Sequence, residues 1–144
     1  MGTQQPAKTC RAKHLIFLSL LMTSSVACAE WEQTQHAGEE TATYYHDKST
    51  IKGTSSAAKM TTIVDYSVAK NLKSGSQYVS IKRVDGYDCR YGTSAPITVS
   101  YFSGPMGTGD LVYAYTVKNS DLEWEPATAS PLVEKHWKIA CGKN

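Results

Sequence analysis

The chain has 144 residues, with 15 Lys and Arg against 13 Asp and Glu and a formal net charge of +2 at pH 7. A chain of this length supports one hydrophobic core, so the sequence predicts a single domain. The near balance of charges lacks the dense basic surface that duplex nucleic acid requires, so nucleic acid is not an expected partner.

The first 29 residues have the pattern of a secretory signal peptide. Three basic residues precede the apolar run 15–22, and small residues follow it up to Ala29. A basic head, an apolar centre and a small-residue end are typical of such peptides. The run is too short to span a bilayer, which takes about 20 residues, and no transmembrane segment is expected elsewhere. We expect cleavage between Ala29 and Glu30, which leaves a domain of residues 30–144 with a net charge of −1.

A lipid anchor at Cys28 is the alternative to cleavage after Ala29. A bacterial lipobox usually has Leu three residues before its cysteine, and this chain has Ser25 at that position. Cleavage is therefore favoured over lipidation, and an N-terminal buried helix is a third, less favoured interpretation. Both leading alternatives predict an extracytoplasmic protein, in the periplasm, on the outer membrane surface or secreted.

Short segments with alternating apolar and polar residues follow, as expected of half-buried strands. The predicted strands are 31–35, 41–46, 58–69, 77–91, 96–102 and 110–117. The segment 46–56 is rich in Asp, Ser, Thr and Gly and predicts a turn. Gly86 suggests a bulge in the fourth strand, and 118–129 reads as a polar connection.

The last segment, 130–142, predicts one helix. Ser130 is a favourable N-cap, Pro131 suits the first helical position, and Gly142 can end the helix in a left-handed conformation. Val133, Trp137 and Cys141 recur every four residues and so share one face. The sequence therefore predicts that this face packs on the strands.

Only two cysteines remain after signal cleavage, Cys89 and Cys141, and an oxidising compartment favours one disulfide between them. Closing a loop of about 50 residues is expected to stabilise the domain by about 4 kcal/mol. A metal site is the alternative, but it needs more ligands nearby, and only His136 lies close to Cys141 in the sequence. The disulfide would fix the helix to one face of the sheet.

The segment "YFSGPMGTGDLVYAY", residues 101–115, is rich in glycine and raises the question of a phosphate-binding loop. Such a loop continues into a helix, whereas Gly109 is followed by Asp110 and a strand pattern. Asp110 would also repel phosphates. We therefore predict a hairpin loop with positive φ at one or more glycines.

The domain shows no arrangement typical of catalysis. It has no GxSxG motif and no spare thiol, and no cofactor or metal is expected. The remaining histidines, His36, His46 and His136, are scattered along the chain. The neighbouring carboxylates are expected to be solvated surface charges: Glu39 with Glu40, and Glu123 with Glu125. A pH-sensing role for a histidine stays open, because histidine titrates near neutrality.

All nine tyrosines and three tryptophans lie after residue 29. Most are expected in the core or in cross-strand pairs. Alternating strands such as 110–117 present side chains on both faces, so some tyrosines are expected at the surface. Exposed tyrosine is frequent in protein recognition, which favours a binding face or a dimer interface.

The ordered segments "TIVDY", "YVSIKRVDGYDCRYG", "VSYFSGPMGTGDLVY", "WEP" and "HWKIAC", with both cysteines in place, resemble the surface-adhesin protein E family. The resemblance covers nearly all of residues 31–144. It implies an α+β fold, in which an antiparallel sheet of about six strands carries one C-terminal helix packed on one face and tethered by a disulfide. It also implies attachment to host extracellular-matrix or serum proteins, and dimers are known among relatives.

The leading hypothesis is thus a secreted or cell-envelope, non-enzymatic binding protein. A periplasmic structural or envelope protein without a host ligand is the first alternative. A small extracytoplasmic hydrolase is the second, and the lack of a paired nucleophile and base disfavours it. The sequence leaves the residues of the binding surface unidentified.

Overall fold

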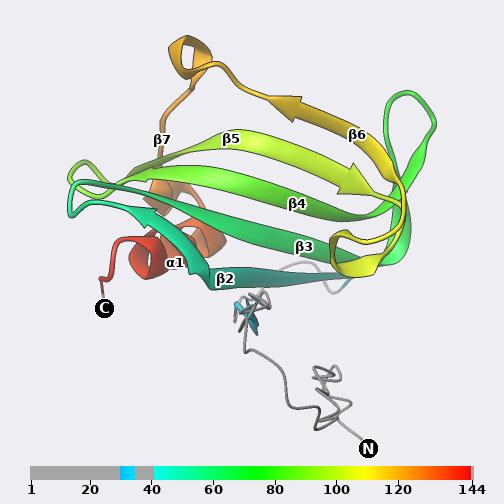
Figure 1. The fold of residues 1–144 in the computed structure, drawn as a ribbon, viewed down its shortest axis with the longest axis horizontal. Helices are drawn as coiled ribbons and strands as arrows, with labels where there is room; N and C mark the ends of the chain where they lie inside the picture. Colours follow the sequence, from blue (N-terminus) through cyan, green and yellow to red (C-terminus); the bar gives the residue numbers. More distant parts are fainter. Residues whose placement is uncertain (1–29, 35–40, 144) are drawn as a thin grey trace, which may run out of the picture.

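The computed structural model describes residues 30–34 and 41–143 (Figure 1). The predicted signal peptide, with its cleavage site after Ala29 and the alternative anchor Cys28, lies outside the described residues. So do His36, Glu39 and Glu40.

Seven strands form one antiparallel sheet in the order β1-β2-β3-β4-β5-β6, with β7 beside the first half of β5 (Figure 1). The bounds are β1 Trp31–Gln33, β2 Ala42–Gly53, β3 Ala57–Asn71, β4 Gln77–Asp88, β5 Thr93–Phe102, β6 Leu111–Thr116 and β7 Glu125–Pro126. The α+β fold, antiparallel sheet and C-terminal helix predicted from the sequence are confirmed. The strand β7 was not predicted, because two residues are too few to show alternation.

The turn predicted over 46–56 is correct only for residues 54–56, which connect β2 and β3. The first part of the segment is strand instead, because β2 continues to Gly53, with an irregular register between Asp47 and Lys52. The carboxylate of Asp47 accepts the backbone N–H of Ser49 at 2.9 Å, and the hydroxyl of Thr50 accepts that of Thr61 at 2.9 Å. Short polar side chains therefore supply hydrogen bonds that the ladder lacks at the irregularity, and the strand is not interrupted.

The bulge predicted at Gly86 is absent from β4, which pairs regularly with both neighbouring strands at this residue. The register shift lies between Val84 and Asp85, where β5 carries Ile97 as an extra residue. A Cβ on Gly86 would lie 3.2 Å from Ile97 Cδ1 and 3.3 Å from Trp124 Cη2. Glycine is needed here for close side-chain approach and not for a bulge of its own strand.

The helix α1, Pro131–Ala140, lies across one end of the sheet, opposite the end that carries the β5–β6 loop (Figure 1). Ser130 occupies the N-cap, but its side chain makes no capping hydrogen bond. Gly142 has φ 61°, and Lys143 N–H donates to Lys138 O at 2.8 Å. The predicted left-handed end is therefore confirmed.

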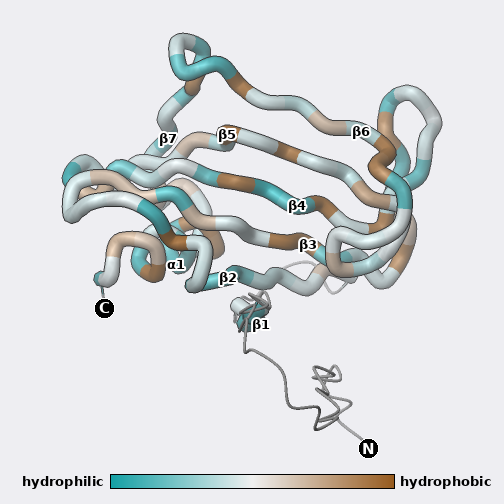
Figure 2. Tube along the Cα trace, in the orientation of Figure 1, coloured by the Kyte–Doolittle hydropathy of each residue, from teal (hydrophilic) through white to brown (hydrophobic). Residues whose placement is uncertain are grey.

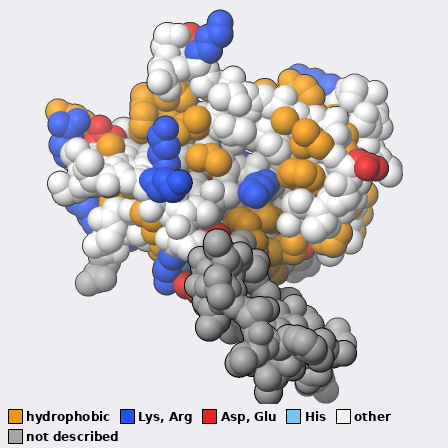
Figure 3. Space-filling view, in the orientation of Figure 1, with side chains coloured by type: hydrophobic (Ala, Val, Ile, Leu, Met, Phe, Trp, Pro, Cys, Tyr) orange, Lys and Arg blue, Asp and Glu red, His pale blue; other side chains and the backbone are white. Residues whose placement is uncertain are grey.

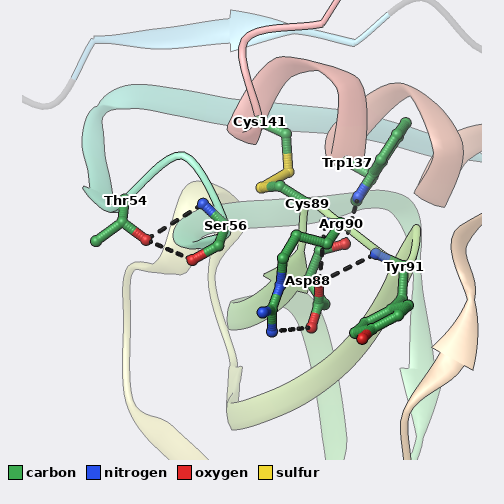
Figure 4. Close-up of a disulfide and its surroundings, with 8 residues drawn as sticks. All are labelled: Thr54, Ser56, Asp88, Cys89, Arg90, Tyr91, Trp137 and Cys141. Atoms are coloured by element: carbon green, nitrogen blue, oxygen red, sulfur yellow. Dashed lines mark hydrogen bonds and ion pairs between the residues drawn. A yellow bond between two sulfur atoms is a disulfide. The ribbon is translucent and has the colours of Figure 1, made fainter.

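A hydrophobic cluster lies beneath α1, and the disulfide belongs to it. Its buried members are Ala58, Met60, Tyr87, Cys89 and Ala140. Cys89 and Cys141 are bonded, with their Cα atoms 5.6 Å apart, and Trp137 beside them donates its Nε1–H to Asp88 O at 3.0 Å (Figure 4). The predicted disulfide between helix and sheet is thus present.

Hydrophobic residues alternate with polar ones along β3 and β4, as Figure 2 shows.

The β5–β6 loop, which contains the short 3-10 helix η1 (Pro105–Gly107), is a hairpin loop as predicted. Gly107 and Gly109 have φ values of 69° and 74°. Its backbone amides face the protein, because Met106 N–H donates to the Asp65 carboxylate and Gly107 N–H to Ser80 Oγ, both at 2.9 Å. These amides are therefore not available to a phosphate.

Candidate binding surface

The face of the sheet that carries α1 is called the helix face below. The cross-strand register places two rows of side chains on this face: Tyr44, Val64, Ile81, Tyr101 and Tyr113, and then His46, Thr62, Arg83, Val99 and Tyr115. The second row begins beside α1 and ends at the edge strand β6. The helix therefore covers only part of the face.

Aromatic rings connect across β3, β4, β5 and β6 in what we call the tyrosine row. The centroid distances are 5.9 Å for Tyr66 and Tyr78, 5.0 Å for Tyr78 and Tyr101, 6.0 Å for Tyr101 and Tyr113, and 6.0 Å for Tyr113 and Tyr115. The first two pairs meet edge to face, a favourable arrangement of aromatic quadrupoles. The row thus holds several amphipathic rings in fixed positions.

The outer end of the tyrosine row is exposed. Tyr113 and Tyr115 on β6 retain 51% and 39% of their accessible surface. Within the described residues β6 pairs only with β5, so its outer side presents free backbone groups. Its residues, "LVYAYT", include no charge and no proline, the features by which edge strands usually avoid pairing. This edge is therefore suited to contact with another molecule.

The opposite face differs in character. On the face that Figure 3 shows, hydrophobic side chains reach the surface in small clusters, and Lys and Arg side chains lie among them singly. Scattered charges of this kind do not form a continuous basic stripe for a phosphate backbone.

A cavity of about 410 Å³ lies between the N-terminal end of α1 and the helix face. Tyr44, Val64 and Tyr87 line it from the sheet, and Leu132 and Val133 line it from the helix. A volume of this size lies in the range of ligand sites. The cavity could not be predicted from the sequence, because it depends on where the helix lies on the sheet.

Arg83 and Asp85 form an ion pair in the wall of the cavity, with Nη2 and Oδ1 2.6 Å apart. Only 9% of the Asp85 side chain is exposed, against 37% of Arg83. Burial raises the pKa of Asp85 above its ordinary value, although the charge and hydrogen bond of Arg83 act in the opposite direction. Arg83 is therefore the main group that favours the ionised form of Asp85.

Glu123 and Glu125 also line the cavity, from the segment that contains β7. Trp124 lies between them in sequence and packs over Gly86 instead. Within residues 30–34 and 41–143, no ion pair engages either glutamate. These two carboxylates, which are neighbours in the sequence, thus share a concave site with Asp85.

A second polar cluster joins β1, β2 and α1. The hydroxyl of Thr34 lies 2.8 Å from His46 Nδ1 and 3.0 Å from His136 Nε2, and all three residues are buried. A single hydroxyl has one proton, so it donates to one ring and accepts from the other. The cluster ties the N-terminal strand to the C-terminal helix, and sequence reasoning missed it because Thr34 is 102 positions from His136.

The Thr34 hydroxyl and His46 resemble a nucleophile and its base, but other features of the cluster point to a structural role. Thr34 is only 5% exposed, and two imidazoles share its hydroxyl. Glu32 is 3.7 Å from His46 Nε2, beyond hydrogen-bond distance, and is engaged by Lys48 at 2.7 Å. No group of three or more His, Cys, Asp or Glu among the described residues is arranged to hold a metal ion.

The stability of the domain is expected to fall as the pH drops below about 6.5, because of His46. Burial lowers the pKa of His46 below its ordinary value of 6.5, although Glu32 opposes the shift. The unfolded chain therefore binds the proton first, and stability is lost between 6.5 and the lower pKa of the folded state. Lys48 and Asp47 on β2 and His136 on α1 are the other titratable groups around the ring.

Urea unfolding at about pH 7.5 and about pH 5.5 measures this effect, with His46→Gln as the comparison. Glutamine does not titrate, so the variant is expected to lose less stability than the wild type between the two pH values. An equal loss in both proteins would show that His46 is not the group responsible.

The fold and this surface define a class: a small, disulfide-bonded α+β domain with exposed tyrosines on one face of its sheet. The model of the family described as "Surface-adhesin protein E" matches residues 31–142. The chain therefore belongs to the surface-adhesin protein E family, as the resemblance of its sequence implied. This is a family of surface or extracytoplasmic proteins.

Solved structures of protein E from Haemophilus influenzae share the fold. Crystal form II is 12% identical, with a TM-score of 0.53, and the match covers 69% of this chain and 80% of that one. The protein from a non-typeable strain is also 12% identical, with a TM-score of 0.51 and coverage of 78% and 86%. A comparison with curated proteins finds no match. In the described part of the chain, no helix has the length and apolar character to cross a bilayer.

Proposed function

We propose that this chain is a non-enzymatic adhesin that binds a host extracellular protein through the outer end of the tyrosine row. The observation that carries the proposal is the exposure of Tyr113 and Tyr115 on a free edge strand. Tyrosine supplies a large contact area at low entropic cost, and it is enriched among the residues that dominate binding energy. Membership of an adhesin family supports the same function.

Replacing both tyrosines, Tyr113→Ser with Tyr115→Ser, is expected to weaken binding to the host protein at least tenfold. Loss of a dominant interface tyrosine costs about 2 kcal/mol, which corresponds to about 30-fold in Kd. Surface plasmon resonance against a panel of purified extracellular-matrix and serum proteins would measure the change. Tyr91→Ser is the matched control, because Tyr91 is 76% exposed but lies outside the tyrosine row. Equal binding by the double variant and the wild type would contradict the proposed surface.

The adhesin function requires the protein to lie on the cell surface, with residues 1–29 removed or Cys28 lipidated. Mass spectrometry of the mature protein distinguishes the two, because a start at Glu30 excludes a lipid on Cys28. Antibody labelling of intact cells tests exposure. Signal that appears only after the outer membrane is opened would favour the periplasmic structural protein instead.

We also propose that the edge strand β6 can form a homodimer. A second copy can pair antiparallel with β6, and the strand has no charge inside it to oppose this. Asp110 precedes β6 and Lys118 follows it, so antiparallel copies bring opposite charges together. Sedimentation of the wild type and of Ala114→Pro, which removes a central backbone donor, tests this arrangement.

A further inference from the structure

We propose that the cavity beneath α1 is a binding site for a basic side chain, lysine or arginine, of a partner polypeptide. This inference deepens the proposed function and rests on it only for the partner being a polypeptide. The apolar walls of the cavity and the charges that line it suit such a side chain.

The charges in the cavity favour a cation. Four charged groups line it: Arg83, Asp85, Glu123 and Glu125. Arg83 and Asp85 neutralise each other through their 2.6 Å contact. Glu123 and Glu125 have no cationic partner within the described residues, so the cavity presents two uncompensated negative charges.

Glu123 and Glu125 flank Trp124 in the sequence, and their side chains are exposed. Trp124 packs over Gly86, with its Cη2 3.3 Å from the position of a Cβ there, while both glutamates line the cavity. Glu125 is further held by the pairing of β7 with β5, where it lies opposite Ser94. The backbone around Trp124 and β7 therefore places both residues at the cavity.

The other walls suit the stem of a lysine or arginine. Tyr44, Val64 and Val117 on one side and Leu132 and Val133 on the other offer mainly apolar contacts. Long basic side chains bury their methylene groups along such surfaces and keep the charge at the polar end. The aromatic rings of Tyr44 and Tyr87 add attraction for a cation where it approaches a ring face.

Two features of the cavity oppose the binding of a cation, and both are weaker than the attraction of the two carboxylates. The N-terminal end of α1, at Ser130 and Leu132, lies at the cavity and carries a partial positive charge of about 0.5, against two full carboxylate charges. Arg83 is positive, but its charge is paired with Asp85. Its Nε, which has no hydrogen-bond partner, is enclosed by protein and is not accessible to an anion.

The test uses a blocked five-residue peptide with one central lysine among glycine and serine, and the same peptide with norleucine in place of lysine. Amide chemical shifts of the ¹⁵N-labelled protein report where each binds. The lysine peptide is expected to shift Ser94, Val117 and Ser130 at the cavity. Norleucine has the same stem without the charge, so its peptide is expected to bind about tenfold more weakly.

The variant Glu123→Gln with Glu125→Gln is expected to weaken the lysine peptide about tenfold. Asp121→Asn is the matched control: it lies in the same connection, bonds to Ser120 and does not line the cavity, so affinity is expected to stay within about twofold. All three positions are exposed, which favours normal folding of the variants.

Three results would overturn the inference: equal binding of the norleucine peptide, preferential binding of a glutamate peptide, or no shift at the cavity with the lysine peptide. Spermidine binding tenfold tighter than the lysine peptide would overturn the choice of a polypeptide partner. The peptide assay contains no host protein, so it can fail while the loss of host binding in the Tyr113 and Tyr115 variant still stands. The reverse outcome would leave the cavity site intact without the adhesin function.

Discussion

Removal of the Cys89–Cys141 disulfide is expected to lower the free energy of unfolding by about 4 kcal/mol. The two cysteines are 52 positions apart, so the bond restricts a long loop in the unfolded chain. Single domains of this size are stable by about 5–15 kcal/mol in total, so the loss is a large part of the whole. Urea unfolding of Cys89→Ser with Cys141→Ser, compared with the wild type, measures the difference.

Reductant provides the control for this experiment. It is expected to destabilise the wild type as much as the double substitution does, and to leave the substituted protein unchanged. A difference below about 1 kcal/mol between wild type and variant would contradict the role assigned to the bond.

The loss is expected to appear first at the end of the sheet that carries α1. Cys141 follows the last residue of the helix, and Cys89 follows β4, so the bond joins the two elements directly (Figure 4). Trp137 holds the same junction through its hydrogen bond to Asp88 O. Hydrogen exchange in the variant is therefore expected to accelerate in α1 more than in the middle of β3 and β4.

The strands and the helix were predictable from the sequence where a pattern of neighbouring residues determines them. Alternation over 58–69 located β3, since a strand with one buried face repeats every two residues. Pro131 and Gly142 located the helix, because each acts through its own backbone conformation. The turn predicted at 46–56 was too long for the same reason: Asp47 and Thr50 have turn propensity, but here their side chains support a continuous strand, and only 54–56 form the turn.

The candidate surface could not be predicted in the same way, because it depends on register between strands. Tyr101 lies beside Tyr113 only through the β5–β6 pairing, and Tyr78 reaches Tyr101 from β4. A shift of one residue in either pair would move a ring to the other face. The sequence predicted that exposed tyrosines exist, but their arrangement follows from the folded sheet.

The cavity and its charges depend on even more distant contacts. Glu123 and Glu125 were recognised as neighbouring carboxylates, but their cavity forms only where α1 crosses the sheet. The ion pair of Arg83 with Asp85 could not be predicted either, because polar residues two positions apart are common on any strand. In the structure, the pair places a buried carboxylate in the wall of the proposed site, so removal of Arg83 is expected to affect stability.

Arg83→Gln is expected to destabilise the domain by about 2 kcal/mol at neutral pH. Removing one partner of a fully buried ion pair costs about 3–5 kcal/mol, and the value here is smaller because Arg83 is 37% exposed. Burial already raises the pKa of Asp85, and loss of the arginine removes the main opposing influence. The folded state of the variant then binds a proton more readily than the unfolded chain, so its stability deficit shrinks as the pH falls through the raised pKa.

Urea unfolding of the wild type and Arg83→Gln at several pH values from about 7 to about 4 measures this dependence. The double variant Arg83→Gln with Asp85→Asn is expected to recover part of the loss at neutral pH, because it leaves no buried charge without a partner. A deficit that stays constant with pH, or a double variant less stable than Arg83→Gln, would show that Arg83 acts through packing alone. The expected result instead makes Arg83 the group that keeps Asp85 ionised, so that Glu123 and Glu125 determine the charge of the cavity.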